Sequence, residues 1–449
     1  MSGTRDLRDW LALLAGRGEL RTLASEIDPD QDVAAVLEHA DGRYAVRFEA
    51  VRGSRFPLVG NTVASRAHFA LAMGCRADEV VGRLAAAIAA PRACAVLASA
   101  PVLAVRDGGD DLLGDLPLPV QHERDGGRYL TSAVVVVRDP RTGLTNLSIN
   151  RLQATGPREL RALMLPGRLR AIFAEHETAG SDLPVALCMG VHPLVLLASQ
   201  APARPDLDDL AVASALYPEP LEVIGVPEVG VPVPAAAEIV LTGHFRAGKR
   251  AEEGPFGEYP RTYGPGGPAP VLELSARYRR EDPIAQTILS GGREHFLLGG
   301  LPREARMAQA LSAAGVDVAT LRLTEGGSCR LHAVIAVRSA GPGTARHAAM
   351  AAFTSVTTLK HVVIVDDDVD VFDAEQVEWA IATRTQADRD LLVIPRTLGS
   401  SLDPSADGNT TAKAVIDATV PAGARDRFAR MRSASASLGP YLAELEGSG

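Results

Sequence analysis

The chain has 449 residues, of which 46% are hydrophobic and 22% charged, and its formal net charge is -9. This length exceeds one ordinary hydrophobic core, so two or three domains are expected. An acidic chain without a basic run and with only 4% aromatic residues lacks the surface that nucleic-acid binding requires, and that class is excluded.

The first part of the chain, up to about residue 100, alternates helices with short strands. Leu7, Trp10 and Leu14 have helical spacing, and the glycines at 16 and 18 predict the end of that helix. Strands are expected at 44–51 and 57–61, and a helix near 84–90. The N-terminus lacks the apolar core of a signal peptide and no segment has the length of a membrane span, which predicts a cytoplasmic protein.

Residues 101 to about 290 contain many short strand patterns separated by turns, which favours a β-barrel-like domain. Strands are expected at 132–137, 144–150, 185–189, 221–225, 238–242 and 271–278. The proline-rich stretches 227–234 and 264–270 are predicted to be loops.

From residue 301 the chain again alternates helices and strands, which predicts a second α/β unit. Helices are expected at 303–314 and 374–383, and strands at 321–323, 330–337 and 361–365. The last of these strands is a continuous apolar run, as in buried parallel sheets.

Cysteine spacing indicates neither a zinc site nor a disulfide framework. The chain has four cysteines, Cys75, Cys94, Cys188 and Cys329, and none forms a CxxC pair. All four are predicted to be buried free thiols, which fits a reducing compartment.

Two motifs suggest ion binding but fit it poorly. Residues 243–249 have the spacing of a phosphate-binding loop, but Arg250 stands where that loop needs Ser or Thr, and the glycines and proline of 252–260 prevent a following helix. The acidic residues 366–370 lack the glycine turn and spaced Glu of a cation loop. Residues 366–370 are predicted to end a strand that precedes a helix capped by Asp373. A metal-dependent hydrolase with its site at 366–370 is the weakest alternative.

Two further motifs point to acid–base chemistry or to anion binding. Glu253 and Glu258 flank a Gly-Pro-Phe-Gly turn that can bring both acids to one side of a tight loop; the alternative is a solvated acidic loop. In 145–151, strand alternation places Arg151 on one face with apolar neighbours. A buried Arg needs an anionic partner, and that partner can be structural or a substrate carboxylate.

These two motifs occur together in one family, and the chain resembles the UbiD-like decarboxylases, which include the ferulic acid and polyprenyl-hydroxybenzoate decarboxylases. Residues 253–258 match the most specific signature of that family, and 145–151 match its cofactor segment. Further agreement occurs at 184–190, 219–221, 238–243, 362–370, 379–383 and 413–419. The resemblance therefore covers essentially the whole chain.

The resemblance implies an α/β (α+β) fold class. The expected domains are an N-terminal α/β segment at 1–105, a flavin-binding split β-barrel domain at 106–300 and a C-terminal α/β oligomerisation domain at 301–449. It also implies prenylated FMN as cofactor, a separate flavin prenyltransferase that supplies it, and a homodimer or larger homo-oligomer. Neither a nucleic acid nor a membrane is an expected partner.

The resemblance also implies residue roles. Arg151 matches the arginine that pairs with the substrate carboxylate, Glu253 completes the network, and Glu258 matches the proton donor. Asn146 and Asp209 match ligands of a divalent metal, manganese or magnesium, and a potassium ion is a further candidate. The residues implied in cofactor binding are Asn146, Ser148, Ile149, Asn150, Arg151, Arg168, Leu169, Asp209 and Lys413.

The sequence departs from the family at the metal. The family histidine is expected near Arg168 and Leu169 and is missing, and Asp209 replaces a glutamate. Either water fills the empty position and the metal binds loosely, or Arg168 turns inward and pairs with the cofactor phosphate.

The function implied by the resemblance is reversible, non-oxidative decarboxylation of an α,β-unsaturated or aromatic carboxylic acid. The flavin supplies the electron sink, while the protein orients the carboxylate and donates a proton. Residues 291–301 are expected to line the substrate pocket. A non-catalytic flavin-binding subunit of the same family is the alternative, and the missing histidine is its main support.

Overall fold

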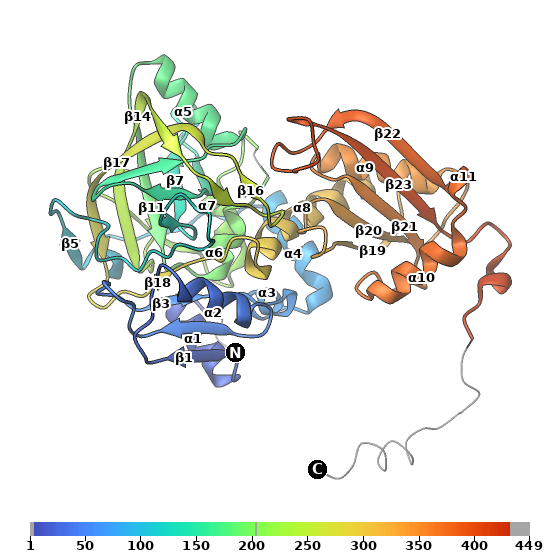
Figure 1. Cartoon of the computed structure of the whole chain (residues 1–449), viewed down its shortest axis with the longest axis horizontal. Coiled ribbons are helices and arrows are strands. Elements are labelled where there is room, and N and C mark those ends of the chain that lie inside the picture. The colour runs from blue at the N-terminus through green and yellow to red at the C-terminus, as the bar shows by residue number, and fades with distance from the viewer. Residues whose placement is uncertain (1–3, 203, 432–449) are drawn as a thin grey trace, which may run out of the picture.

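The computed structural model describes residues 4–202 and 204–431. Figure 1 shows a β-rich central unit, a smaller N-terminal unit below it and a C-terminal unit whose sheet lies to one side. This mixture of helices and sheets agrees with the predicted α/β (α+β) class. Among the helices within these two ranges, none combines the length and the apolar character that crossing a membrane requires.

The N-terminal unit is a small sheet covered by helices. Its first helix begins where Asp6 accepts a hydrogen bond from the Asp9 main chain, and it buries the predicted apolar face of Trp10 and Leu14. The elements are α1 (Leu7–Gly16), β1 (Leu20–Leu23), α2 (Asp32–Ala40), β2 (Ala45–Phe48), β3 (Leu58–Gly60), α3 (Arg66–Met73) and α4 (Val80–Ala89). The sheet order is β1-β2-β3-β18, and β18 (Ala285–Gln286) comes from the end of the central unit, so the two units share a sheet.

The central unit is built on a nine-stranded sheet with the path β6-β9-β10-β17-β14-β11-β7-β8, to which β5 adds beside β17. Its strands are β5 (Val105–Asp107), β6 (Tyr129–Leu130), β7 (Val134–Arg138), β8 (Thr145–Ile149), β9 (Leu152–Ala154), β10 (Glu159–Ala162), β11 (Leu183–Met189), β14 (Ile239–Glu253) and β17 (Gly267–Arg279). Smaller strands are β4 (Ala95–Val96), β12 (Glu222–Gly225), β13 (Pro232–Pro234), β15 (Phe256–Gly257) and β16 (Tyr263–Gly264). Its helices are α5 (Arg168–Thr178), α6 (Pro193–Ala198) and α7 (Asp209–Leu216).

The predicted loops at 227–234 and 264–270 are partly wrong, because β13 and the start of β17 fall within them. Strand β17 pairs with β14 from Gly267 onward, but its other neighbour β10 begins to pair only at Val271. The prolines of this stretch therefore sit where one side of the strand is unpaired, and a missing N–H is tolerated there.

The C-terminal unit is a five-stranded sheet of order β19-β20-β21-β23-β22, in which β20, β21 and β23 run parallel. Its elements are α8 (Arg293–Ala313), β19 (Val318–Leu323), β20 (His332–Val337), α9 (Thr344–Ser355), β21 (His361–Asp366), α10 (Ala374–Arg384), α11 (Ala387–Asp390), β22 (Leu391–Leu398) and β23 (Thr410–Ala418). The buried parallel strand predicted at 361–365 is confirmed as β21.

Helix α8 begins ten residues before the predicted start at 303 and contains Pro302 in its interior. A proline removes one main-chain hydrogen bond and ordinarily marks the first turn of a helix. Here burial of Phe296, Leu297 and Leu301 stabilises the preceding turns. The helix runs through the expected domain boundary at residue 300.

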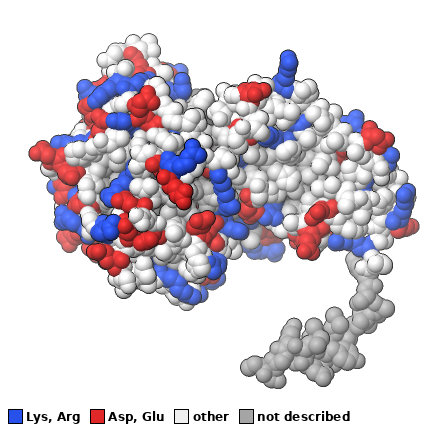
Figure 2. Space-filling model, in the orientation of Figure 1, with Lys and Arg blue, Asp and Glu red and all other residues white. Residues whose placement is uncertain are grey.

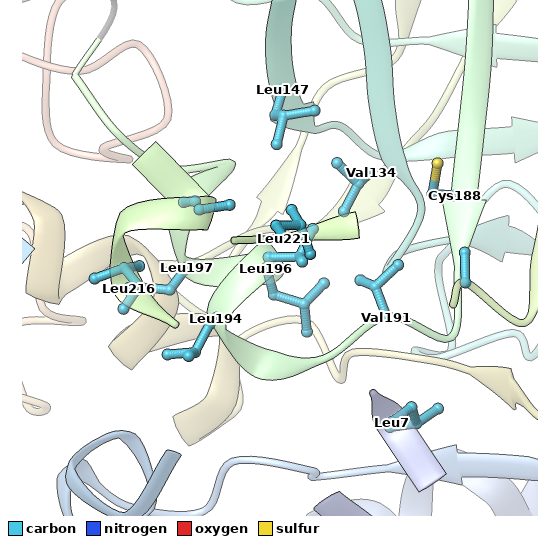
Figure 3. Close-up of a cluster of buried hydrophobic side chains, with 14 of the residues drawn as sticks. Leu7, Val134, Leu147, Cys188, Val191, Leu194, Leu196, Leu197, Leu216 and Leu221 are labelled. Atoms are coloured by element: carbon cyan, nitrogen blue, oxygen red, sulfur yellow. The ribbon is translucent and has the colours of Figure 1, made fainter. Parts of the chain in front are cut away.

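The largest apolar core joins the N-terminal and central units. Figure 3 shows leucines of α6 facing Val134 of β7 and Leu147 of β8, with Leu7 of α1 nearby. Strand β8 is therefore anchored by Leu147 on a packed core, and this fixes the position of the polar residues beside it. Acidic and basic side chains are interspersed over the face shown in Figure 2.

The prediction of four buried thiols is wrong for two of them. Cys188 and Cys329 are buried, whereas Cys75 and Cys94 are partly exposed, and all four are free. Cys75 follows the end of α3 and Cys94 precedes the short edge strand β4, so both pack only at the margin of the largest core.

Candidate active site

Arg151 lies between β8 and β9 and is clamped by the two acids predicted from the sequence. Its Nη2 donates to Glu253 Oε2 at 2.7 Å and its Nη1 donates to Glu258 Oε1 at 2.5 Å. The side chains of Arg151, Glu253 and Glu258 are 6%, 1% and 10% exposed. The alternative of a solvated acidic loop is therefore wrong.

Glycines allow the acidic loop to close around Arg151. Gly254 has a φ of +90°, and a Cβ atom there would lie 2.8 Å from Gly266 Cα and 3.3 Å from Arg151 Nη2. A Cβ atom at Gly264 would lie 3.0 Å from Glu258 Cγ and 3.2 Å from Arg151 Nη1. The backbone thus approaches the guanidinium from two sides, and the long β14–β17 hairpin holds both segments in place.

Burial controls the charge of this network. Burial raises the pKa of Glu258 above its ordinary value, although the adjacent Arg151 guanidinium acts in the opposite direction. The pKa of Arg151 is raised, because its pairing with Glu253 and Glu258 outweighs the opposing effect of burial. The site therefore contains a fixed cation next to a carboxyl group that binds a proton more readily than an exposed glutamate.

A cavity of about 660 Å³ opens beside the network and reaches from the central unit to the C-terminal unit. Its size lies within the range of cofactor and small-molecule sites, roughly 300–1,000 Å³. Seven of the residues predicted for the cofactor line it, namely Asn146, Ser148, Ile149, Asn150, Arg151, Arg168 and Leu169. Glu258 also lines it, while Glu253 lies behind Arg151.

Lys413 does not line this cavity. Its ammonium group donates to the main-chain carbonyl groups of Thr357 and Leu359, and burial lowers its pKa to about 8. Thr357 does line the cavity, so Lys413 supports the wall from behind.

One end of the cavity contains buried polar atoms without partners among the described residues: Asn146 Oδ1, Arg168 Nε and Arg168 Nη2. Asp209 lies behind them, where its Oδ2 accepts hydrogen bonds from Asn146 Nδ2 and the Leu147 main chain, each at 2.8 Å. Burial raises the pKa of Asp209 to about 7. Unpaired donors of a buried guanidinium suit a phosphate group, and the apolar lining beside them suits a flavin ring. The cavity therefore fits FMN or its prenylated form.

The donor set fits a divalent metal less well. Arg168 Nη1 lies 3.6 Å from Asp209 Oδ1, so a guanidinium already stands beside the single carboxylate. No group of three or more His, Cys, Asp and Glu side chains suited to a metal occurs within residues 4–202 and 204–431. The Arg168 side chain lies inward beside Asp209, which is the orientation that pairing with a cofactor phosphate needs.

The acidic cluster at 366–370 forms no site of its own. Asp366 and Asp368 both pair with Arg384, at 3.1 Å and 2.7 Å. The predicted cap is confirmed, since Asp373 accepts hydrogen bonds from the main chain of Glu375 and Gln376.

The sequence interpretation missed a basic wall of the cavity, formed by Arg303, Arg306 and Arg330. His295 and Gly299 lie on the same wall and fall within the predicted lining segment 291–301. His295, Gly299 and Arg303 are four residues apart, which is the signal of one helix face. Because the helix was predicted to begin at residue 303, His295 and Gly299 were not expected on the same helix as Arg303.

The comparisons with known proteins cover the whole architecture. Residues 11–88, 95–293 and 296–418 match the N-terminal, Rift-related and C-terminal domains of the 3-octaprenyl-4-hydroxybenzoate carboxy-lyase (UbiD) family. The chain is 36% identical over 416 residues to the anhydromevalonate phosphate decarboxylase of Methanothermobacter thermautotrophicus, covering 92% of this chain and 97% of that protein.

Solved structures agree with this match. The UbiD-class enzyme HmfF from Pelotomaculum thermopropionicum in complex with FMN has a TM-score of 0.94 and 45% identity, covering 97% of this chain and all of that chain. An evolved dimeric form of HmfF in complex with prFMN has a TM-score of 0.90 and 42% identity, covering 98% of this chain and all of that chain. The predicted fold, a barrel-type sheet between separate N- and C-terminal units, is confirmed.

Proposed function

The chain belongs to the UbiD family of decarboxylases, and from this premise we propose that it removes CO2 reversibly from an α,β-unsaturated or aromatic carboxylic acid with prenylated FMN. The observation that carries the proposal is the buried cluster of Arg151, Glu253 and Glu258 on a cavity that fits a flavin. A cation, an acid that holds a proton and a cavity with apolar lining for the flavin ring are what decarboxylation needs from the protein.

Arg151 orients the substrate carboxylate. A guanidinium presents planar, paired donors that match a carboxylate, and Glu253 fixes the orientation of this one through Nη2. A substrate carboxylate competes with Glu258 for Nη1. Two anions beside one guanidinium repel each other, so substrate binding favours the protonated form of Glu258.

Glu258 then donates its proton. The bond between the substrate carbon and its carboxylate breaks, and CO2 leaves. The electron pair of that bond remains with the substrate and finally forms a C–H bond with the proton from the Glu258 carboxyl group. Prenylated FMN, when bound, supplies the electron sink for that pair. Burial keeps Glu258 protonated at a higher pH than an exposed glutamate, so that the acid form is available.

Cofactor contacts are proposed for the residues that line the cavity next to Arg151. Arg168 would bind the phosphate through its unpaired nitrogens, and Asn146 would contribute its free amide oxygen. A divalent ion, manganese or magnesium, is proposed to bind loosely through Asn146 and Asp209, and no step depends on it. A potassium ion, a homodimer or larger assembly, a cytoplasmic location and supply by a flavin prenyltransferase remain predictions.

The proposal is tested with protein co-produced with a flavin prenyltransferase. Its ultraviolet–visible spectrum reports the cofactor, and CO2 release is measured with cinnamic, hydroxybenzoic, heteroaromatic and aliphatic unsaturated acids. Turnover of at least one acid by cofactor-loaded protein is expected. A loaded protein that turns over none of them would instead support the alternative, a flavin-binding subunit without activity of its own.

A further inference from the structure

The main chain between the two acids is held in place by a segment from another part of the chain. Residues 121–129, which lead into β6 and which we call the support segment, lie against the loop at 253–258. The Gly126 main chain donates a hydrogen bond to the Pro255 carbonyl group at 2.8 Å, and a Cβ atom at Gly126 would lie 2.3 Å from the Gly254 carbonyl oxygen. The two backbones are therefore in direct contact, and a side chain at position 126 does not fit between them.

Asp125 connects the support segment to the residue immediately before Glu258. Its Oδ1 accepts a hydrogen bond from the Gly257 main chain at 2.8 Å, and its Oδ2 accepts one from the His122 main chain at 3.0 Å. The Asp125 side chain is 0% exposed. A buried carboxylate is unfavourable unless hydrogen-bond donors face it, and one of the two donors here belongs to the loop of the acids. A local turn at 122–125 uses only one of the two oxygens, so a purely local role for Asp125 leaves the contact with Gly257 unexplained.

Gln153 on β9 fastens the other end of the loop. Its side chain is buried, its Nε2 donates to the Gly126 carbonyl group at 2.7 Å, and its Oε1 accepts a hydrogen bond from the Gly254 main chain at 3.1 Å. One amide group therefore bridges the support segment and the residue that follows Glu253. Because Gln153 is two residues from Arg151 in sequence, the same bridge ties the loop to the strand that begins beside the guanidinium.

The carbonyl group of Gly257 is held as well. Ser290 Oγ donates to it at 2.5 Å, and Ser290 is buried. Both main-chain polar groups of Gly257 are thus paired with buried side chains, Asp125 on one side and Ser290 on the other. Because Gly257 directly precedes Glu258, these two contacts fix the point from which the Glu258 side chain extends.

Phe256, in the middle of the loop, packs between the support segment and the guanidinium of Arg151. Its ring centre lies 4.4 Å from that of Tyr129, and the guanidinium carbon of Arg151 lies 5.4 Å from the Phe256 ring centre. The Tyr129 hydroxyl group donates to the Pro255 carbonyl group at 3.4 Å. A shift of the support segment would therefore move the loop and also the ring against which Arg151 packs.

The main-chain contacts become important when substrate binds. Without substrate, Arg151 Nη1 holds the Glu258 carboxyl group at 2.5 Å. Under the proposed function a substrate carboxylate competes for that nitrogen, so Glu258 then depends on its main chain for its position. Proton transfer needs a donor within reach of the accepting atom, and a displacement of about 1 Å can reduce a rate by about 100-fold.

We propose that Asp125 is a positioning residue for proton transfer, which holds Gly257 in place while the Glu258 side chain is released from Arg151. The inference rests on the proposed function for the role of Glu258. Asp125 does not line the cavity and acts through the main chain of the loop, with Gly126 and Gln153 completing the contact. A change at position 125 should therefore act on kcat and leave the binding of substrate and cofactor unchanged.

The first test needs no turnover. Hydrogen–deuterium exchange is measured by mass spectrometry on FMN-loaded protein, in peptides that contain residues 253–258. Asp125→Ala should raise amide exchange in these peptides about tenfold or more, as expected for the loss of one hydrogen bond to a charged group, while peptides of the C-terminal unit exchange as in wild type. Glu123→Ala removes an exposed carboxylate from the same segment and is the matched control, which should leave exchange at 253–258 unchanged.

The second test separates positioning from binding. With the acid that the wild-type holoenzyme turns over fastest, Asp125→Ala should lower kcat about tenfold or more, and KM and FMN affinity should stay within about twofold. Asp125→Asn keeps one oxygen for the Gly257 main chain and should recover part of the loss. Gly126→Ala places a methyl group against the Gly254 carbonyl group and should also lower kcat, whereas Gly109→Ala, where the added Cβ has no atom within 4 Å, should not.

The outcomes are distinct. Wild-type exchange at 253–258 together with wild-type kcat in Asp125→Ala would overturn the proposal. A loss that falls mainly on KM or on FMN affinity would also overturn it, because it would indicate a role in binding. If Asp125→Ala fails to fold, Asp125→Asn and Gly126→Ala decide the question by the same measurements. A loaded wild-type protein that turns over no acid would count against the proposed function, whereas exchange at 253–258 would still decide whether Asp125 holds the loop.

Discussion

Replacing Glu258 by glutamine tests the proton donor directly. Glutamine has nearly the same shape as glutamate, and its amide oxygen can still accept a hydrogen bond from Arg151 Nη1. The 2.5 Å hydrogen bond of Glu258 is therefore replaced by a similar one. The buried charge is lost, but burial already disfavours that charge, so the protein should fold and bind FMN normally. Only the transferable proton is removed, and the loss should therefore fall on kcat.

A positioned general acid contributes about 100- to 10,000-fold to a rate, which corresponds to about 3–5 kcal/mol of barrier. Cofactor-loaded Glu258→Gln should lose CO2 release by that factor. Glu252→Gln is the matched control, because it makes the same change on an exposed side chain of β14. Near-normal turnover by loaded Glu258→Gln would refute the assignment.

Three further predictions follow from the same contacts. Arg151→Lys keeps the charge but cannot reach Glu253 and Glu258 with two paired donors, so kcat/KM should fall about tenfold or more; a rate close to wild type would make Arg151 a structural ion-pair member. Dialysis against chelator should remove any divalent metal from holoprotein, because Arg168 already stands beside Asp209; metal analysis that finds a stoichiometric ion after prolonged chelation would contradict this. Since burial raises the pKa of Asp209 from 3.8 to about 7, its contribution to stability is complete below about pH 3.8 and declines as pH rises through 7. The free energy of unfolding of wild-type protein without cofactor should therefore fall relative to that of Asp209→Asn by about 1 kcal/mol per pH unit between pH 4 and pH 7 and stay level above pH 7, and a difference that does not change with pH over this range would contradict it.

Each of the two motifs of the site was readable from the sequence because the residues within it are close together along the chain. The segment at 145–151 and the turn at 253–258 each carry a local pattern. Their pairing through Arg151 was implied by the family resemblance, and it agrees with the need of a buried cation for acids. The direction of the Glu258 pKa was not readable, because burial and Arg151 act in opposite directions and only the packed structure determines which prevails.

The basic wall shows the limit of sequence reasoning. Pro302 is an ordinary sign of a helix start, so the first turns of α8 and the alignment of His295 with Arg303 were hidden. Arg330 is distant in sequence and reaches the cavity only because Gly299 leaves room for it. Tertiary packing overrode the local signal, as burial of an apolar face often does.

The sequence by itself indicated most of the elements, because strand alternation and turn chemistry are local properties, and its resemblance to a known family implied the class of fold and the cluster of Arg151, Glu253 and Glu258. Only the tertiary structure decided where Arg168 points and which residues share the cavity with Glu258. These depend on contacts between the central and C-terminal units, and the free energy of such contacts comes from burial and from charges brought together by the fold.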